Sequence, residues 1–230
     1  MKTIGLLGGM SWESTHEYYK FLNETVRERL GGLHSAKCLL YSFDFAEIEM
    51  LQQQGAWDEA AKRLAAMAKK LQDAGADLLI ISSNTMHRMA PEVEAAISIP
   101  FLHIADPTAV LIKKQGLRKI GLLGTKYTME QDFYKGRLVQ KHGLEVIVPD
   151  EKDRETVNHI IYEELCVGRI VTASKQRYLD IIKSLQKQGA EAIILGCTEI
   201  GLLISQDDVA LPVFDTARIH AETAVSLALQ

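Results

Sequence analysis

The sequence has few cysteines and no basic run, and these absences exclude several classes of protein. Its three cysteines, Cys38, Cys166 and Cys197, lie far apart and form no CxxC or Cys/His pair with metal spacing. A disulfide framework or a structural metal site is therefore not expected. The formal net charge is −4 and no Lys/Arg run is present, so nucleic acid is not an expected partner.

Long apolar runs are also absent. The longest stays far below the roughly 18 residues that a membrane-spanning helix needs, and the first residues, Met1–Leu7, read as a strand rather than as a signal peptide. We therefore expect a soluble, cytoplasmic protein without a membrane partner. With 230 residues, of which 47% are hydrophobic, the chain can form one large or two small domains.

Short apolar runs alternate with helical patterns along the whole chain. The positions Trp57, Ala60, Leu64, Met67 and Leu71, for example, have helical spacing and precede a glycine. This alternation predicts an α/β protein with parallel sheets covered by helices. The runs that read as strands are 4–7, 38–41, 78–81, 101–103, 120–123, 144–148, 192–195 and 213–214.

An internal repeat relates the two halves of the chain. Residues 75–85 and 189–199 read almost alike, Ile4–Gly8 recurs as Ile120–Gly124, and Pro100–Leu102 is echoed by Pro212–Phe214. The offset of about 114 residues predicts two similar domains with four-stranded parallel sheets, related by a pseudo-twofold axis.

The expected domains are residues 1–103 plus 211–230, and residues 104–210. Ligands of open α/β sheets bind at the carboxyl ends of the strands, where the repeated polar clusters fall. The cleft between the domains is therefore the expected active site.

Alignment of the repeat places Ser83 opposite Cys197. Cys197 precedes an expected helix, whose N-terminus would lower the pKa of the thiol and favour a general base or a nucleophile. A lone cysteine is otherwise a small buried hydrophobic residue, which is our interpretation of Cys38. His87 and His103 are interpreted as structural histidines.

Other polar residues at the strand ends have two possible roles. The turn Gly8–Ser11 could hold an anion with its N–H groups or be a tight turn. Thr125 and Thr128 could bind a substrate carboxylate, and Gln52, expected in an exposed loop, could supply an amide donor. The clusters Asn84-Thr85 and Thr198-Glu199 could cap helices or contact a substrate.

Three motifs resemble the aspartate/glutamate racemase family: Gly5–Ser11, Asn84–His87 and Gly196–Glu199. The resemblance implies a usually dimeric enzyme of two α/β domains that needs no metal and no pyridoxal phosphate or other cofactor. In that family two cysteines flank the α-carbon of the amino-acid substrate. One removes the α-proton and the other returns a proton on the opposite face.

The chain departs from the family pattern at three positions. The first family cysteine falls on Ser83, a family arginine falls near Phe45, and a family lysine falls near Cys166. Because a serine hydroxyl is a far weaker acid than a thiol, we expect a slow racemase that depends on Cys197, with Ser83 as its partner. Without the two basic residues, broad specificity is possible. The expected substrate-binding residues are Met10, Gln52, Asn84, Thr85, Thr125, Thr128, Thr198 and Glu199.

Two other functions fit the sequence. A relative with one catalytic cysteine could act as a decarboxylase or a cis–trans isomerase of small dicarboxylates, since decarboxylation needs a single proton donor. A protein that lost its second cysteine could instead bind amino acids without catalysis.

Overall fold

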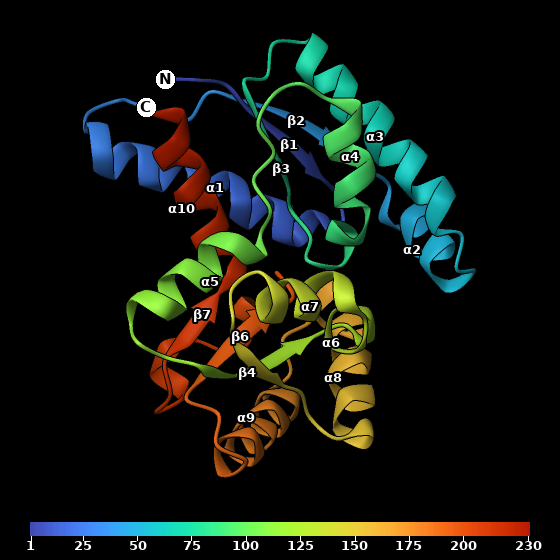
Figure 1. Cartoon of the computed structure of the whole chain (residues 1–230), viewed down its shortest axis with the longest axis vertical. Coiled ribbons are helices and arrows are strands. Elements are labelled where there is room, and N and C mark those ends of the chain that lie inside the picture. Colours follow the sequence, from blue (N-terminus) through green and yellow to red (C-terminus); the bar gives the residue numbers. More distant parts are fainter. The chain divides into compact units, whose positions relative to one another are not determined.

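The computed structural model describes all 230 residues, and the chain divides into two compact units (Figure 1). Unit 1 comprises Met1–Ile104 and Ala217–Gln230, and unit 2 comprises Ala105–Thr216. Both are α/β units with an all-parallel sheet, as the alternating pattern predicts. No helix has the combination of length and apolar character that crossing a membrane requires.

The sheet of unit 1 has three strands in the order β2-β1-β3. Ile4 lies opposite Cys38 on one side and Leu78 on the other. The strands are β1 (Ile4–Gly8), β2 (Cys38–Ser42) and β3 (Leu78–Ile81).

The fourth strand that we expected over residues 101–103 is reduced to a single parallel bridge between Leu79 and Phe101. Beyond that bridge, the backbone groups bind side chains instead of a neighbouring strand. The carbonyl of Leu102 contacts the His220 ring, and the N–H of Ile104 donates to the His87 ring. The ladder therefore ends after one bridge.

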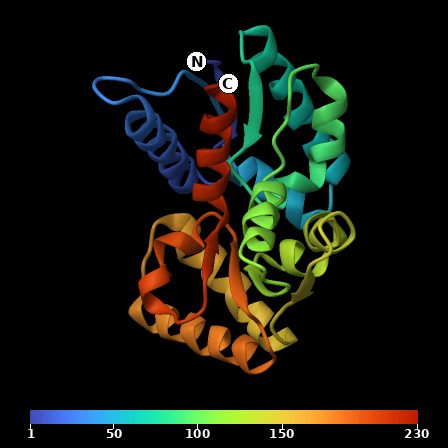
Figure 2. The same cartoon turned by 60° about the vertical axis from the view of Figure 1, so that its left-hand side comes forward.

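Helices cover both faces of the unit 1 sheet, because alternate residues of its strands point to opposite sides. Ile4 and Leu6 pack against α1 and α10, which lie side by side (Figure 2), whereas Leu7 and Ile81 pack against α2, α3 and α4. The helices are α1 (Trp12–Leu30), α2 (Phe45–Gln53), α3 (Trp57–Asp73), α4 (Ala90–Ala96) and α10 (Thr216–Ala228), with the 3₁₀ turn η1 (Thr85–Met89) before α4.

The sheet of unit 2 has four strands in the order β5-β4-β6-β7. Ile120 lies opposite Ala192, and Ile193 lies opposite Val213. The latter pair occupies the place that Leu79 and Phe101 have in unit 1, so the sequence repeat is also a repeat of topology. The strands are β4 (Lys119–Gly124), β5 (Glu145–Ile147), β6 (Ala192–Gly196) and β7 (Val213–Asp215).

Residues 211–216, which we expected to return to the first domain, lie instead in unit 2. The reason is that β7 pairs with β6, which holds this segment in the second sheet. The return to unit 1 begins at Ala217.

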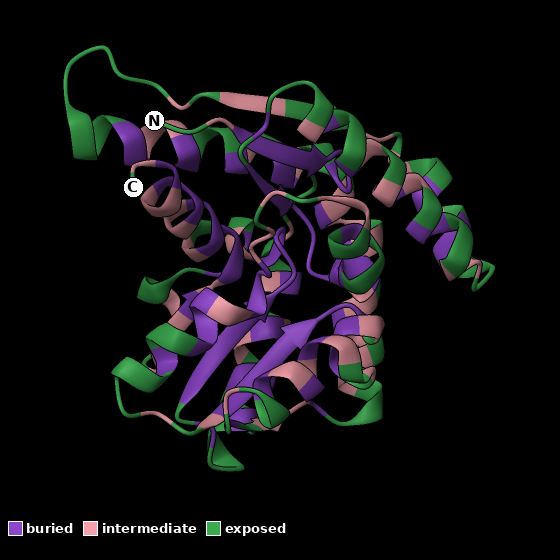
Figure 3. Cartoon of the chain, turned by 45° about the horizontal axis from the view of Figure 1, so that its top comes forward, coloured by how far each residue is buried: buried purple, intermediate pink, exposed green.

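One face of the unit 2 sheet packs against α8 and α9 through Leu123, Ile193 and Leu195. These strand residues are fully or almost fully buried, and Figure 3 colours the central strands of this sheet mostly as buried. Helices α5 and α7 pack against each other, and α6 follows β4. The helices are α5 (Ala105–Lys114), α6 (Lys126–Glu130), α7 (Asp132–Gln140), α8 (Glu151–Glu163) and α9 (Thr172–Lys187), with 3₁₀ turns η2 (Leu165–Val167), η3 (Ile200–Leu202) and η4 (Gln206–Asp208).

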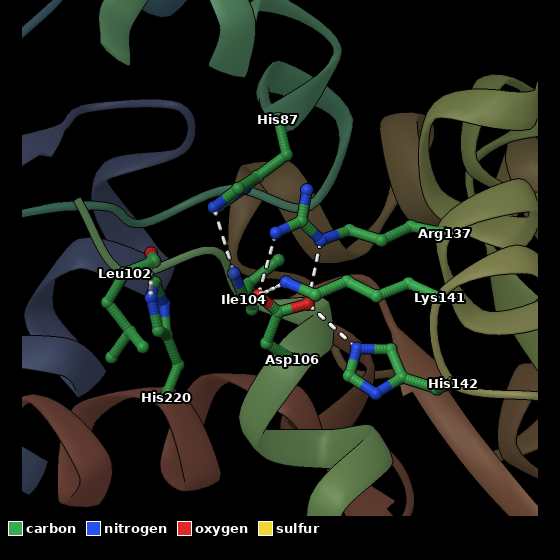
Figure 4. Close-up of polar contacts among 8 residues, drawn as sticks. All are labelled: His87, Leu102, Ile104, Asp106, Arg137, Lys141, His142 and His220. Carbon is green, nitrogen blue, oxygen red and sulfur yellow. Dashed lines mark hydrogen bonds and ion pairs between the residues drawn. The ribbon is translucent and has the colours of Figure 1, made fainter.

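An ion-pair network ties α5 to the end of α7 in unit 2 (Figure 4). The Asp106 carboxylate accepts two hydrogen bonds of 2.7 Å from Arg137, one of 2.8 Å from Lys141 and one of 2.9 Å from His142. Burial alone would raise the pKa of Asp106, but the bonds from Arg137, Lys141 and His142 outweigh it and hold that pKa far below its usual range.

We expect Asp106→Asn to lower the free energy of unfolding by about 1–3 kcal/mol at neutral pH, because two cations would lose a partly buried partner. Since the folded state lowers the pKa of Asp106, this stabilisation exists above the unfolded-state pKa and is lost as pH falls. The difference between the proteins in chemical denaturation should therefore shrink below about pH 4. Asp73→Asn, which removes an exposed partner of Lys69, is the control and should change stability by less than about 0.5 kcal/mol.

Candidate active site

Two serines follow β3, and they have different surroundings. The Ser82 hydroxyl lies 3.2 Å from the carbonyl oxygen of Leu7, to which it donates, and 3.1 Å from Thr15 Oγ1. It is therefore engaged inside unit 1. Ser83 Oγ accepts a long hydrogen bond of 3.4 Å from the N–H of Met86. Of the two hydroxyls, that of Ser83 is the one less firmly held by the fold.

The glycine turn after β1 is shaped by close packing. A Cβ on Gly9 would lie 2.2 Å from the carbonyl oxygen of Phe43, and Gly9 has a φ of +82°. Its N–H donates to Thr15 Oγ1 at 2.8 Å, so this group is already used within the fold. Met10 is buried in the apolar cluster with Leu7. The contacts favour the tight-turn interpretation over the anion cradle.

We expected Gln52 in an exposed loop, and this expectation was wrong. Gln52 is in the last turn of α2 and is only 4% exposed, because α2 continues through the run of glutamines and turns this one inward. Its Nε2 donates to the sulfur of Met86 at 3.1 Å. Met86 belongs to η1, the turn that also begins with Thr85 and follows Ser83 and Asn84. Gln52 is therefore linked, through Met86, to the turn that carries three other predicted site residues.

Cys197 follows β6 and faces a buried carboxylate. Its thiol donates to Glu199 Oε2 at 2.9 Å, and Thr198 Oγ1 donates to the same oxygen at 2.8 Å. Cys197, Thr198 and Glu199 are each at most 7% exposed. One buried carboxylate oxygen thus receives a thiol and a hydroxyl.

The pKa of the Cys197 thiol is raised well above its ordinary value, so our expectation of a lowered pKa was wrong. Burial is the main cause, and the negative charge of Glu199 adds to it. The residues after Cys197 form the single 3₁₀ turn η3 instead of an α-helix, and therefore no helix dipole compensates. In this arrangement Cys197 is a protonated thiol.

Thr125 and Thr128 lie at the same edge of the unit 2 sheet as Cys197. They follow β4, which neighbours β6, with Gly124 opposite Gly196. Thr125 caps α6 by accepting from the N–H of Thr128 at 3.3 Å, and the two hydroxyl oxygens are 3.3 Å apart. Unit 2 thus gathers four predicted residues, the two threonines with Thr198 and Glu199, around the strand end that bears the thiol.

Two features of the site were missed in the sequence. The Cys197–Glu199 contact could have been anticipated, because residues two apart after a strand end can turn back on each other. The role of His87 could not have been anticipated from the sequence. Its ring contacts the carbonyl of Ser83 and the N–H of Ile104, and the second contact joins residues with no sequence pattern in common.

Two repeated parallel units, with small polar residues after β3 in one and after β6 in the other, define a duplicated α/β protein with a buried thiol at one strand end. The chain belongs to the Asp/Glu/Hydantoin racemase family, whose model matches residues 7–224. The resemblance seen in the three motifs is thereby confirmed.

Similar proteins agree with this membership. A crystal structure of a candidate Asp/Glu racemase from Yersinia pestis has 58% identity, covers 100% of both chains and superposes with a TM-score of 0.92. An aspartate racemase homologue from Pyrococcus horikoshii has 40% identity, 100% coverage of both chains and a TM-score of 0.86. The broad specificity amino-acid racemase RacX of Bacillus subtilis is 27% identical over 177 residues, which are 74% of this chain and 72% of that protein.

Proposed function

We propose that this protein is a cofactor-independent amino-acid racemase that interconverts the L- and D-forms of aspartate, glutamate and further amino acids. Membership of the racemase family supports the activity. The observation that carries the mechanism is the buried Cys197 thiol, which donates to the Glu199 carboxylate. A thiol and a carboxylate in contact are a pair between which a proton can move.

In the proposed mechanism, Glu199 takes the thiol proton when substrate binds, and the Cys197 thiolate then removes the α-proton of the substrate. The α-carbon becomes a carbanion, and the proton bound to sulfur replaces the one that passed to Glu199. Thr198 donates to the same carboxylate oxygen, which holds that oxygen toward the thiol. The thiolate exists only during the reaction, consistent with its raised pKa in the resting protein.

Ser83 delivers a proton to the opposite face of the carbanion and regains one from solvent, directly or through Thr85. Glu199 then releases the proton it took from the thiol to solvent, which restores the resting protein. A hydroxyl is a poor acid compared with a thiol, so this half of the reaction is slow. Because L- and D-enantiomers are equally stable, kcat/KM must be equal in the two directions. A difference between directions therefore appears only in kcat and KM taken separately.

The family has a basic residue near Phe45 and another near Cys166, and the side chains found at these two positions favour broad specificity. Phe45 packs against the apolar cluster of unit 1, and Cys166 packs against that of unit 2. Neither can pair with a side-chain carboxylate. In this proposal Gln52, Asn84, Thr85, Thr125 and Thr128 bind the substrate through uncharged hydrogen-bonding groups, which do not require a negative charge on the substrate side chain.

The experiment is to incubate the purified protein, without added cofactor, with single enantiomers of aspartate, glutamate and a panel of neutral amino acids. Chiral chromatography should show the opposite enantiomer accumulating toward an equal mixture. Loss of carboxylate would indicate a decarboxylase. Thermal stabilisation by amino acids with no reaction would indicate a binding protein.

As the resemblance implies, we further propose that the protein is a cytoplasmic homodimer.

A Glu199→Gln variant separates thiol ionisation from catalysis. Removing the negative charge should lower the pKa of Cys197, so that alkylation by iodoacetamide proceeds at lower pH than in the unchanged protein. Racemisation should nevertheless fall by about 10²-fold, because the acceptor of the thiol proton is lost. Exposed Glu163 provides the control. Glu163→Gln should change neither the pH at which Cys197 is alkylated nor the rate of racemisation. Unchanged racemisation in Glu199→Gln would exclude Glu199 as the acceptor of the thiol proton.

A further inference from the structure

The His87 ring connects Ser83, which follows β3, to Ile104, the last residue of the first segment of unit 1. Figure 4 shows its contact with Ile104. Its Nδ1 lies 2.6 Å from the carbonyl oxygen of Ser83, and its Nε2 lies 3.1 Å from the backbone nitrogen of Ile104. The side chain is 1% exposed. All three residues belong to unit 1, so the connection is internal to one compact unit.

These two partners determine where the ring carries its proton. A backbone N–H can only donate, so Nε2 must accept from Ile104 and cannot bear a hydrogen. A carbonyl oxygen can only accept, so Nδ1 must bear the hydrogen and donate it to Ser83. His87 is therefore a neutral ring with one fixed tautomer. A group whose two nitrogens are both engaged in this way positions its neighbours and does not exchange protons with a substrate.

The segment that anchors His87 is itself held from a second side. His220 Nε2 donates to the carbonyl of Leu102 at 2.9 Å, and its Nδ1 pairs with the Tyr18 hydroxyl at 2.9 Å. The ring of His103 lies 4.6 Å from that of His87, between centroids. Residues 102–104 are thus held by two histidines, and the bond from His87 to the carbonyl of Ser83 is a separate contact of the same ring.

We propose that His87 is a positioning residue for Ser83. By holding the carbonyl of Ser83, it fixes the peptide from which the Ser83 hydroxyl projects, and so sets where that hydroxyl stands for proton delivery. The Ser83 hydroxyl has only a long bond of 3.4 Å from Met86, so its place depends on the backbone. A displacement of about 1 Å in a catalytic group can cost about 10²-fold in rate.

Two substitutions separate the contacts of His87. The amide nitrogen of asparagine takes the place of Nδ1, so His87→Asn keeps the donor to Ser83 and loses the acceptor for Ile104. Glutamine reaches the place of Nε2, so His87→Gln keeps an acceptor for Ile104 and loses the donor to Ser83. The matched control is His220→Asn, which loses the donor to Leu102 and leaves the contact between His87 and Ser83 in place.

The test rests on the proposed racemase activity and uses the full chain in D₂O. For the enantiomer whose α-proton is removed by Cys197, NMR and chiral chromatography give two rates: α-deuteration with inversion, which needs the Ser83 face, and α-deuteration with retention, which needs Cys197 alone. We expect His87→Gln to lower the ratio of inversion to retention about tenfold or more. His87→Asn and His220→Asn should keep that ratio within about twofold of the unchanged protein.

A merely structural role of His87 would lower both rates together and leave their ratio constant, which would overturn the inference. An equal fall of the ratio in His87→Asn and His87→Gln, or a fall in His220→Asn, would also overturn it. Absence of any α-deuteration by the unchanged protein would refute the proposed function instead, so the two failures are distinguishable. Circular dichroism and thermal melting confirm that each variant is folded.

Discussion

Replacing Cys197 by alanine is expected to reduce racemisation by about 10³-fold or more. In the proposed mechanism the Cys197 thiolate takes the α-proton directly in one direction, and the thiol returns it in the other; a positioned acid or base typically contributes 10²–10⁴-fold. Alanine has a similar shape and leaves Glu199 without the thiol donor, so binding of the substrate is affected less than the chemical step. Steady-state rates of D-aspartate formation from L-aspartate measure the loss.

The control for this variant is Cys38→Ala. Cys38 lies on β2 in unit 1 and is half-buried, and it has no part in the proposed reaction. Its replacement should leave kcat and KM within about twofold of the unchanged protein. Full activity in Cys197→Ala would contradict the mechanism, and an equal loss in Cys38→Ala would show that the assay reports folding.

Ser83→Cys is expected to raise racemisation about tenfold to 100-fold. A thiol has an ordinary pKa of about 8.5, whereas a serine hydroxyl is not appreciably ionised at neutral pH. The substitution therefore places an acid and base of suitable strength on the second face of the substrate. The increase should appear in kcat, because the substrate-binding groups are unchanged.

Ser82→Cys is the matched control, one position earlier. The Ser82 hydroxyl is engaged with Leu7 and Thr15 in the interior, so a larger sulfur there should lower stability and give no gain in rate. A Ser83→Cys variant with unchanged or lower racemisation, while still folded, would show that Ser83 is not the partner of Cys197. A gain from Ser82→Cys would assign that role to Ser82.

The architecture could be predicted from the sequence because it depends on repeated local patterns. The β-strand of Ile4–Gly8 and its echo at Ile120–Gly124 form the same kind of central strand in the two sheets. The helical spacing from Trp57 to Leu71 is that of α3, and Gly75 follows it with a φ of +100°. Such features need only neighbouring residues and periodicity.

Features that depend on tertiary contacts could not be predicted in this way. The failure of residues 101–103 to form a full strand follows from His87 and His220, which capture the backbone groups from distant helices and turns. The sequence places Gln52 in an exposed loop after the second strand, yet in the structure it is buried and its amide contacts Met86. In each case the deciding partner is far away in the sequence.

The chemistry of the site was predicted in part. The motif around Cys197 pointed to the thiol, but the direction of its pKa shift was wrong, because that shift depends on burial and on the position of the Glu199 carboxylate. Ser83 was selected from the repeat, and the structure adds the reason why its neighbour Ser82 is less suited. The roles of both residues remain proposals that the variants above test.

The most direct test of the account is α-proton exchange of L-aspartate in D₂O, followed by ¹H NMR, with the unchanged protein and Cys197→Ala in parallel. The account predicts loss of the α-proton signal with the unchanged protein, accompanied by formation of D-aspartate, and no measurable exchange with Cys197→Ala. Exchange that persists at the full rate in Cys197→Ala would contradict the central claim that this thiol removes the α-proton.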